Sequence, residues 1–225
     1  MDYTIAKLKD DIQRKTHGTS LNKIQDIDGL INEASRNFLA DVDPAETIRI
    51  EELAANLETD VYDYVLPVDL KGNKIIDIRP AEDRGIADKF SQTYSEAFDL
   101  RKSDGTFNIE YNSGVKTIRI AKTILASSDQ NPFSVVYYSK YIFRDSSGDW
   151  KEEQDDDTDI VNLDTDSYNL MLDKCMMIVA VQIAGIDSSY DYKITDNKYQ
   201  ITLARYKGNN KSQIKQPRVN YYNMK

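Results

Sequence analysis

Asp155, Asp156 and Asp157, within the run EEQDDDTD, are the residues whose type and spacing come nearest to a chemical site. Carboxylates at alternate positions are typical of calcium loops, but an EF-hand loop also requires glycine at its sixth position and glutamate at its twelfth. Counted from Asp155, those two positions hold Ile160 and Asp166. The EF-hand pattern therefore fails, and a solvated acidic loop is favoured over an ordered metal site. No metal or cofactor is expected.

The chain has one cysteine and one histidine, so it can form neither a two-histidine metal site nor an H-E-x-x-H motif. Cys175 falls on an apolar helical stripe, which favours a buried structural thiol over a nucleophile. His17 precedes Gly18 and suits a helix end or the surface. The sequence contains neither of the glycine-rich phosphate-binding motifs G-x-x-x-x-G-K-[ST] and G-x-G-x-x-G. We therefore expect no catalytic residue. The enzymatic alternative is a hydrolase that uses carboxylate pairs, which needs a cleft and a shifted pKa.

Charge is distributed unevenly in this acidic chain, whose formal net charge is −9. Such a balance argues against a protein that grips duplex DNA, since phosphate contacts need clustered Lys and Arg. Residues 145–166 are strongly acidic, whereas residues 205–225 contain six basic residues and no acid. This basic end favours docking on a protein partner. Two other uses remain open: Tyr221 and Tyr222 stacking on bases, or an added strand on a neighbour.

Helical periodicity appears at both ends of the chain. Residues 19–40 form an amphipathic pattern through Ile24, Ile27, Ile31, Ala34 and Phe38, with Thr19 or Ser20 as the cap. A shorter helix is predicted through Ile5, Leu8 and Ile12. Residues 43–60 predict another helix, because Asp43, Pro44 and Glu46 match an N-cap, a first helical position and a capping box. These helices would form a hairpin.

Strand patterns fill the middle of the chain. Residues 61–80 predict two strands joined by a turn at residues 71–73, with Pro67 at a strand end or edge. Residues 107–120 alternate as a β-hairpin whose turn is Asn112-Ser113-Gly114. Residues 132–143 predict a further tyrosine-rich strand. Residues 84–100 are ambiguous and are also compatible with a short helix. Together the strands suggest an antiparallel meander or sandwich.

Helical patterns return after the acidic run. Residues 167–184 carry an apolar stripe, and Asp164, Thr165 or Asp166 is in place to cap it. A second helix is predicted over residues 194–206, and the chain from residue 207 onward looks extended. No stretch approaches the about 18 apolar residues that a membrane span requires, and one cysteine excludes an internal disulfide, which favours a reducing compartment.

These patterns predict an α+β fold: a helical bundle formed by N- and C-terminal helices, with an inserted antiparallel β-domain and an extended C-terminal tail. The expected boundaries are residues 1–60 for the N-terminal helices and 61–160 for the β-rich domain. Residues 161–206 hold the C-terminal helices and 207–225 the basic tail.

Two short runs resemble sequences of head-tail connector (adaptor) proteins of tailed bacteriophages. Ile31-Asn32-Glu33-Ala34-Ser35-Arg36 is similar to an I-N-E-A-x-R run in the first helix of these proteins. Tyr64-Val65-Leu66-Pro67-Val68-Asp69 is similar to their Y-x-L-P-x-D strand. The order of helices, strands and helices matches over most of the chain and is closest over residues 21–80. The resemblance points to the ring proteins of short-tailed phages, including the crAss-like group.

The resemblance implies a non-enzymatic virion protein that forms a homo-oligomeric ring, usually of twelve copies, at the portal vertex and neck, after assembly in the host cytoplasm. Implied partners are the portal and other neck or tail proteins, with no membrane, and DNA passes through without specific binding. The acidic residues Asp155, Asp156 and Asp157 would line the channel and repel phosphates. The candidate portal contacts are Arg205, Lys207, Lys211, Lys215, Arg218, Tyr221 and Tyr222.

Two alternatives to the adaptor ring remain. One is another neck or tail component, such as a tail-hub, tail-tube or stopper subunit. The other is the carboxylate-based enzyme described above.

Overall fold

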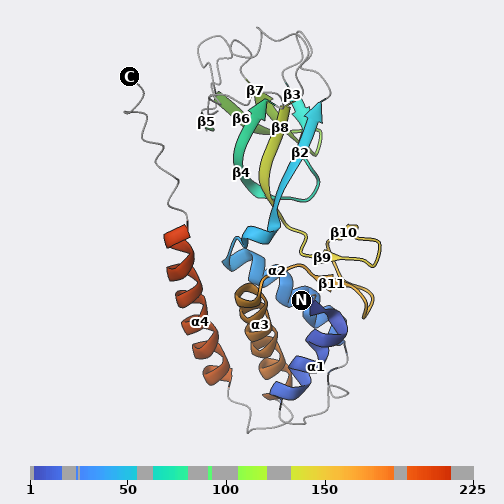
Figure 1. Cartoon of the computed structure of the whole chain (residues 1–225), viewed down its shortest axis with the longest axis vertical. Helices are drawn as coiled ribbons and strands as arrows, with labels where there is room; N and C mark the ends of the chain where they lie inside the picture. The colour runs from blue at the N-terminus through green and yellow to red at the C-terminus, as the bar shows by residue number, and fades with distance from the viewer. Residues whose placement is uncertain are drawn as a thin grey trace, which may run out of the picture. The chain divides into compact units, whose positions relative to one another are not determined.

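A computed structural model describes residues 3–16, 24, 26–54, 63–80, 91–92, 106–120, 133–184 and 192–213. The chain divides into two compact units (Figure 1). The helical unit joins Met1–Glu46 to Tyr141–Lys225, and the β-unit is Thr47–Lys140. The fold is therefore α+β, with a β-unit inserted between N- and C-terminal helices. No helix in the described part of the chain is long and apolar enough to cross a membrane.

Four helices and one small sheet make up the described part of the helical unit. The helices are α1 (Ile5–Lys15), α2 (Ile27–Asp41), α3 (Thr165–Ala184) and α4 (Tyr192–Gln213). The strands are β1 (Tyr3–Thr4), β9 (Phe143–Arg144), β10 (Trp150–Lys151) and β11 (Ile160–Val161). They pair in the order β1-β11-β9-β10. Pairing of β1 with β11 ties the two ends of the chain into one unit.

One apolar core joins all four helices. Leu8 of α1, Phe38 of α2, Met171 of α3 and Tyr199 of α4 are buried within it. Within α1, for example, Ile5, Leu8 and Ile12 are buried at helical spacing, so the helix turns one face inward. Burying such side chains stabilises the unit by roughly 1.5–3 kcal/mol each. Residues from both ends of the sequence therefore form one core.

Short polar side chains fix the start of three helices. Thr4 accepts a hydrogen bond from the Lys7 amide, Asp26 from the Gly29 amide and Asp164 from the Ser167 amide. Each cap satisfies a backbone donor that has no partner within the helix. At α2 a Cβ on residue 29 would stand 2.1 Å from Oδ2 of Asp26, so glycine allows the cap to close. Of the three cap candidates for α3, Asp164, Thr165 and Asp166, the structure uses Asp164, and the helix begins at Thr165.

Two sheets form the β-unit. The first has the order β2-β8-β4, with β2 Ile48–Ala54, β8 Phe133–Ser139 and β4 Leu70–Pro80. The second has the order β3-β7-β6-β5, with β3 Asp63–Val65, β7 Val115–Ile120, β6 Thr106–Asn112 and β5 Ser91–Gln92. Buried residues of both sheets, such as Val135 and Ile118, share one apolar cluster. The unit is therefore a small sandwich.

The hairpin of β6 and β7 is confirmed as the sequence predicts it. Ile109 pairs with Ile118, and Asn112 pairs with Val115. Between the strands, Ser113 has φ 53° and Gly114 φ 83°. A type I′ turn requires positive φ at both central residues, which explains the glycine.

The helix predicted over residues 43–60 is wrong for the residues that the structure describes. Ala45–Thr47 form one 3-10 turn, and Ile48–Ala54 are strand β2. Pairing of β2 with β8 overrides the local capping signal, since a strand partner supplies hydrogen bonds along the whole segment. The hairpin predicted between this helix and the one before it is therefore also wrong, and the β-unit begins at Thr47 and ends at Lys140, compared with the expected 61 and 160.

Other boundaries also differ from the prediction. Helix α2 begins at Ile27 after the Asp26 cap, and Thr19, Ser20 and His17 lie outside the described residues. Strands β3 and β4 belong to different sheets, and the turn expected at residues 71–73 is part of β4. The strand predicted to residue 143 ends at Ser139.

The extended tail predicted from residue 207 is wrong for its first seven residues. Helix α4 continues to Gln213, so residues 207–213 are helical. Residues 214–225 lie outside the described part of the chain, as do most of residues 84–100.

Candidate functional site

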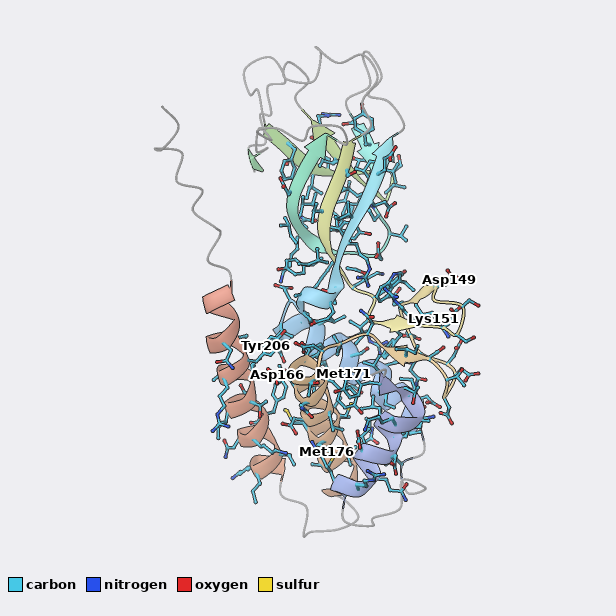
Figure 2. All side chains as sticks on the ribbon, in the orientation of Figure 1. Asp149, Lys151, Asp166, Met171, Met176 and Tyr206 are labelled. Carbon is cyan, nitrogen blue, oxygen red and sulfur yellow. The ribbon has the colours of Figure 1, made fainter. Side chains whose placement is uncertain are left out.

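The acidic segment, defined as residues 145–159, is an ordered loop that carries β10 and packs on α1 and α2. At its start the Asp145 carboxylate accepts hydrogen bonds from the amides of Ser147 and Asp149, at 2.8 and 2.9 Å. Gly148 between them has φ 91°, a left-handed conformation that suits glycine. Figure 2 labels Asp149 and Lys151 on this loop, on the far side of the helical unit from Tyr206 of α4. Side chain to backbone bonds thus shape its outer turn.

Asn32 anchors the middle of the acidic segment to α2. Its Oδ1 accepts from the Gln154 amide at 3.0 Å, and its Nδ2 donates to the Gln154 carbonyl at 3.2 Å. Asn32 is 8% exposed and Gln154 is 2% exposed. One buried side chain amide therefore satisfies both backbone groups of a loop residue, as buried polar groups require.

The run Ile31–Arg36 thereby acquires a structural role. Ile31 and Ala34 are fully buried in the core, whereas Asn32 and Arg36 reach the acidic segment. Arg36 pairs with Glu153 at 2.5 Å. The sequence pattern that resembles the adaptor proteins is thus the part of α2 that packs the helix and holds the loop.

Asp159 organises the inner end of the acidic segment. It is 1% exposed, and its Oδ2 accepts from Lys151 at 2.8 Å and from the amides of Asp155 and Asp156. Burial by itself would raise the pKa of Asp159, but these hydrogen bonds favour the charged carboxylate and the pKa is lowered. Asp159 is therefore an internal anion that closes the loop.

The three candidate channel residues Asp155, Asp156 and Asp157 lie together and are exposed, and each already has a partner. Asp155 pairs with Lys151, Asp156 accepts from the amide and hydroxyl of Thr158, both at 2.8 Å, and Asp157 pairs with Lys9 at 2.6 Å. No group of three or more metal-binding side chains able to hold an ion occurs among the residues that the structure describes. These aspartates present negative charge at the surface of an ordered loop.

Lys9 joins the acidic segment to both N-terminal helices. Its ammonium lies 2.8 Å from Asp28 of α2 and 2.6 Å from Asp157. Partial burial opposes its charge, but hydrogen bonds with the two carboxylates outweigh this and raise the pKa of Lys9. The loop is thus held by one cation from α1 and by Asn32 and Arg36 from α2.

The structure describes some of the candidate portal-binding residues and not others. Arg205 and Lys207 are exposed on α4, Lys211 lies within the same helix, and Lys215, Arg218, Tyr221 and Tyr222 lie outside the described residues. Helix α4 is firmly attached: Tyr199 donates to Asp41 at 2.6 Å, and Thr202 donates to Asp173 at 3.2 Å. Arg205 and Lys207 therefore belong to a rigid helix.

In the β-unit, Asp69 connects a turn to strand β8. Its carboxylate accepts from the Tyr137 hydroxyl at 2.8 Å and from the Ser139 hydroxyl at 2.6 Å. Burial of Tyr137, together with its bond to Asp69, raises the pKa of the phenol. A phenol held protonated in this way remains a hydrogen-bond donor. Asp69, Tyr137 and Ser139 therefore form a hydrogen-bonded cluster that joins the turn to β8.

The two outer faces of the β-sandwich differ in chemistry. On the β2-β8-β4 sheet, Ile48 and Ile50 lie opposite Tyr138 and Val136, and Ile50 is 67% exposed. The bulge residue Ile76 of β4 is 46% exposed.

The outer face of the second sheet is charged. There Arg119 binds both oxygens of Asp63, at 2.6 and 2.7 Å, and approaches Glu110 at 3.4 Å. The outer face of the first sheet exposes three isoleucines at one end, while Glu52 and Asp77 lie on the same face.

Cys175 is fully buried in the core, as the sequence predicts. Burial raises the pKa of its thiol to about 12, so little thiolate exists near neutral pH and the side chain is a poor nucleophile.

Sequence reasoning missed Asn32, Asp159 and Tyr137, whose partners lie far away in the chain. Only the polar character of Asn32 within an apolar helical stripe gave a local signal. Comparison with protein-family models finds no match, and comparison with curated protein sequences finds none either.

Proposed function

We propose that this chain is a structural virion protein, a subunit of the head-tail adaptor ring that joins the portal of a tailed bacteriophage to its tail. Its work is mechanical and electrostatic. Copies of the chain surround part of the DNA channel at the neck, after assembly in the host cytoplasm, and they perform no chemical step.

The observation that carries the proposal is the group of exposed isoleucines on the outer face of the β2-β8-β4 sheet. Isoleucines at positions 48, 50 and 76 are exposed there beside Tyr138. Exposed apolar area is unfavourable in water and is removed by protein-protein contact. A protein built to stand among copies of itself and other neck proteins has a use for such a face.

The arrangement of the chain also supports the proposal. Helices from both ends form one unit with a β-unit inserted between them, the order that the resemblance to adaptor proteins implies. The Ile31–Arg36 run, which carries part of that resemblance, anchors the acidic segment through Asn32 and Arg36. Residues that resemble the family therefore hold the loop that we assign to the channel.

Charge fits the same role. The exposed Asp155, Asp156 and Asp157 would repel DNA phosphates, so that the double helix slides without binding. The C-terminal residues from 214 onward contain Lys215, Arg218 and Lys225 and no acid, and they suit a docking segment for the portal.

The test is the mass of the purified protein in solution, alone and mixed with the portal protein of the same phage. We expect a defined ring complex on the portal. A chain that ends at Gln213 should keep its circular dichroism spectrum and melting temperature but lose the portal complex. A protein that remains monomeric with the portal and is absent from purified virions would contradict the proposal. Assembly that ignores the portal would indicate a tail-hub, tail-tube or stopper subunit.

A further inference from the structure

The outward face of helix α4 exposes two isoleucines, with the polar residues Asn197 and Lys198 between them. Tyr199, Leu203 and Tyr206 turn toward the body of the helical unit. On the opposite side, Ile194 is 67% exposed and Ile201 is 55% exposed. Arg205, four residues after Ile201, continues the same stripe because helical neighbours recur at three and four positions. Two isoleucines and an arginine thus form a line of roughly 16 Å, at 1.5 Å per residue.

Gly208, three residues after Arg205, extends this stripe. A glycine in a helix interior is less favourable than alanine by about 1 kcal/mol. A Cβ added to Gly208 would meet no atom within 4 Å, so packing inside the described fold does not require its small size. Close approach of another protein surface would require it.

The charge of α4 indicates what kind of surface fits it. Of its five basic residues Arg205 lies on the outward face and Lys198 pairs with Asp173 at 3.0 Å, and the helix holds one acid. The acidic segment carries eight acids and one lysine. Oppositely charged surfaces steer association and fix the register of a contact. The acidic segment is therefore the complementary surface that the described residues offer.

Within one copy the two surfaces cannot meet. Helix α4 packs on α3 and reaches the C-terminal end of α2 through Asp41. The acidic segment packs on α1 and on α2 at Asn32. Figure 1 shows α4 on one side of the helical unit and β9–β11 on the other. A second copy is needed to bring them together.

We propose that the outward face of α4, formed by Ile194, Ile201, Arg205 and Gly208, docks on the acidic segment of the next copy of this chain at its outer turn, around Asp149 and Glu152, and leaves Asp155, Asp156 and Asp157 uncovered. Two different surfaces then meet at each contact, which is a heterologous contact that closes into a ring when its rotation permits. This inference rests on the proposed ring function and names the surfaces that build the ring.

The experiment uses two variants with one surface blocked in each. The first carries Ile201→Glu and Arg205→Glu on α4, and the second carries Asp149→Lys and Glu152→Lys in the acidic segment. All four positions are exposed, and circular dichroism with thermal melting checks the fold. Arg14→Glu on α1 is the matched charge reversal away from both surfaces.

Each blocked variant should require a roughly tenfold or greater concentration to assemble, whether alone or on the portal. Arg14→Glu should assemble as the unchanged chain does. A 1:1 mixture of the blocked variants should recover association at least as far as a dimer, since it contains one intact pair of surfaces and one pair in which both charges are reversed. Rings that persist in both variants, or a mixture that remains monomeric, would overturn the inference and leave the ring function standing. If the unchanged chain assembles neither alone nor on the portal, the proposed function fails as well.

A crosslink provides a second measurement that needs no charge reversal. Copies with Gly208→Cys and copies with Asp149→Cys are mixed and treated with a short bis-maleimide. Native Cys175 is buried and does not compete. A dimer band that needs both cysteines is the expected result, and its absence in assembled rings would contradict the contact.

Discussion

The buried side chain of Asn32 holds the backbone of Gln154 by two hydrogen bonds across 122 residues of sequence. An N-terminal helix thereby fixes a loop that the sequence alone describes only as a run of charges. The acidic segment is therefore held in a defined position on the helical unit.

Asn32→Ala tests this anchor. The substitution leaves the amide and carbonyl of Gln154 buried without partners, and each such group costs about 1–3 kcal/mol. We expect the free energy of unfolding to fall by roughly 2 kcal/mol in urea denaturation. Glu33→Ala, an exposed change on the same helix, is the control and should stay within about 0.5 kcal/mol of the unchanged protein. Equal effects of the two would refute the anchor.

The pH dependence of stability tests Asp159. Its folded pKa lies below the ordinary value of 3.8, so the charged carboxylate stabilises the folded state above that value. This contribution is complete above about pH 5 and is lost as the pH falls through the folded pKa. Asp11, Asp28 and Asp41 act in the same direction.

Asp159→Asn should therefore lower stability at pH 7 and flatten the loss of stability between about pH 5 and pH 2. The measurement is urea denaturation at a series of pH values. Asp166→Asn, an exposed change, should keep the slope of the unchanged protein. If stability falls with pH in Asp159→Asn as steeply as in the unchanged protein, another group causes the loss of stability at low pH.

Tyr137→Phe tests the hydrogen-bonded cluster around Asp69 in the β-unit. The ring and its packing remain, but Asp69 loses one of its two hydroxyl donors. A hydrogen bond to a charged group contributes about 1.5–3 kcal/mol, so the β-unit should unfold at a lower urea concentration. Tyr111→Phe, at a tyrosine that is 66% exposed, is the matched control and should have little effect.

Ile50→Glu tests whether the exposed isoleucines of the β2-β8-β4 sheet form a contact in the ring. In a free chain this exposed position should tolerate the charge, so the melting temperature should change little. In the assembled ring the charge would be buried without a partner and should reduce assembly strongly. Val68→Glu places the same charge at a turn residue that is 84% exposed. Equal assembly of both variants, measured by light scattering with the portal, would argue against contact at this face.

Reactivity of Cys175 reports on the core of the helical unit. With the pKa of its thiol near 12 and no exposed surface, reaction with a thiol reagent at pH 8 should be far slower than for the unfolded chain. Labelling in increasing urea, followed by mass spectrometry, should rise together with loss of helical circular dichroism. Rapid labelling of the native protein would place Cys175 outside the core.

Local patterns were sufficient where an element stabilises itself. The apolar spacing of Leu8 and Ile12 predicts α1, the three cap candidates at residues 164–166 predict the start of α3 to within two residues, and Ser113-Gly114 predicts the β6–β7 turn. The α+β class and the burial of Cys175 follow from the same kind of pattern. In each case the signal lies within a few residues of its effect.

Distant pairing decided the rest. Asp43 and Pro44 have the sequence of a helix start, but Ile48 pairs with Tyr138, and the strand wins because its partner supplies a ladder of hydrogen bonds. No local pattern reveals that partner, which lies 90 residues away. The hold of Asn32 on Gln154, the closure of the acidic segment by Asp159 and the outward face of α4 likewise depend on which surfaces meet. Sequence periodicity determined which residues face inward, and only the tertiary structure decided what they face.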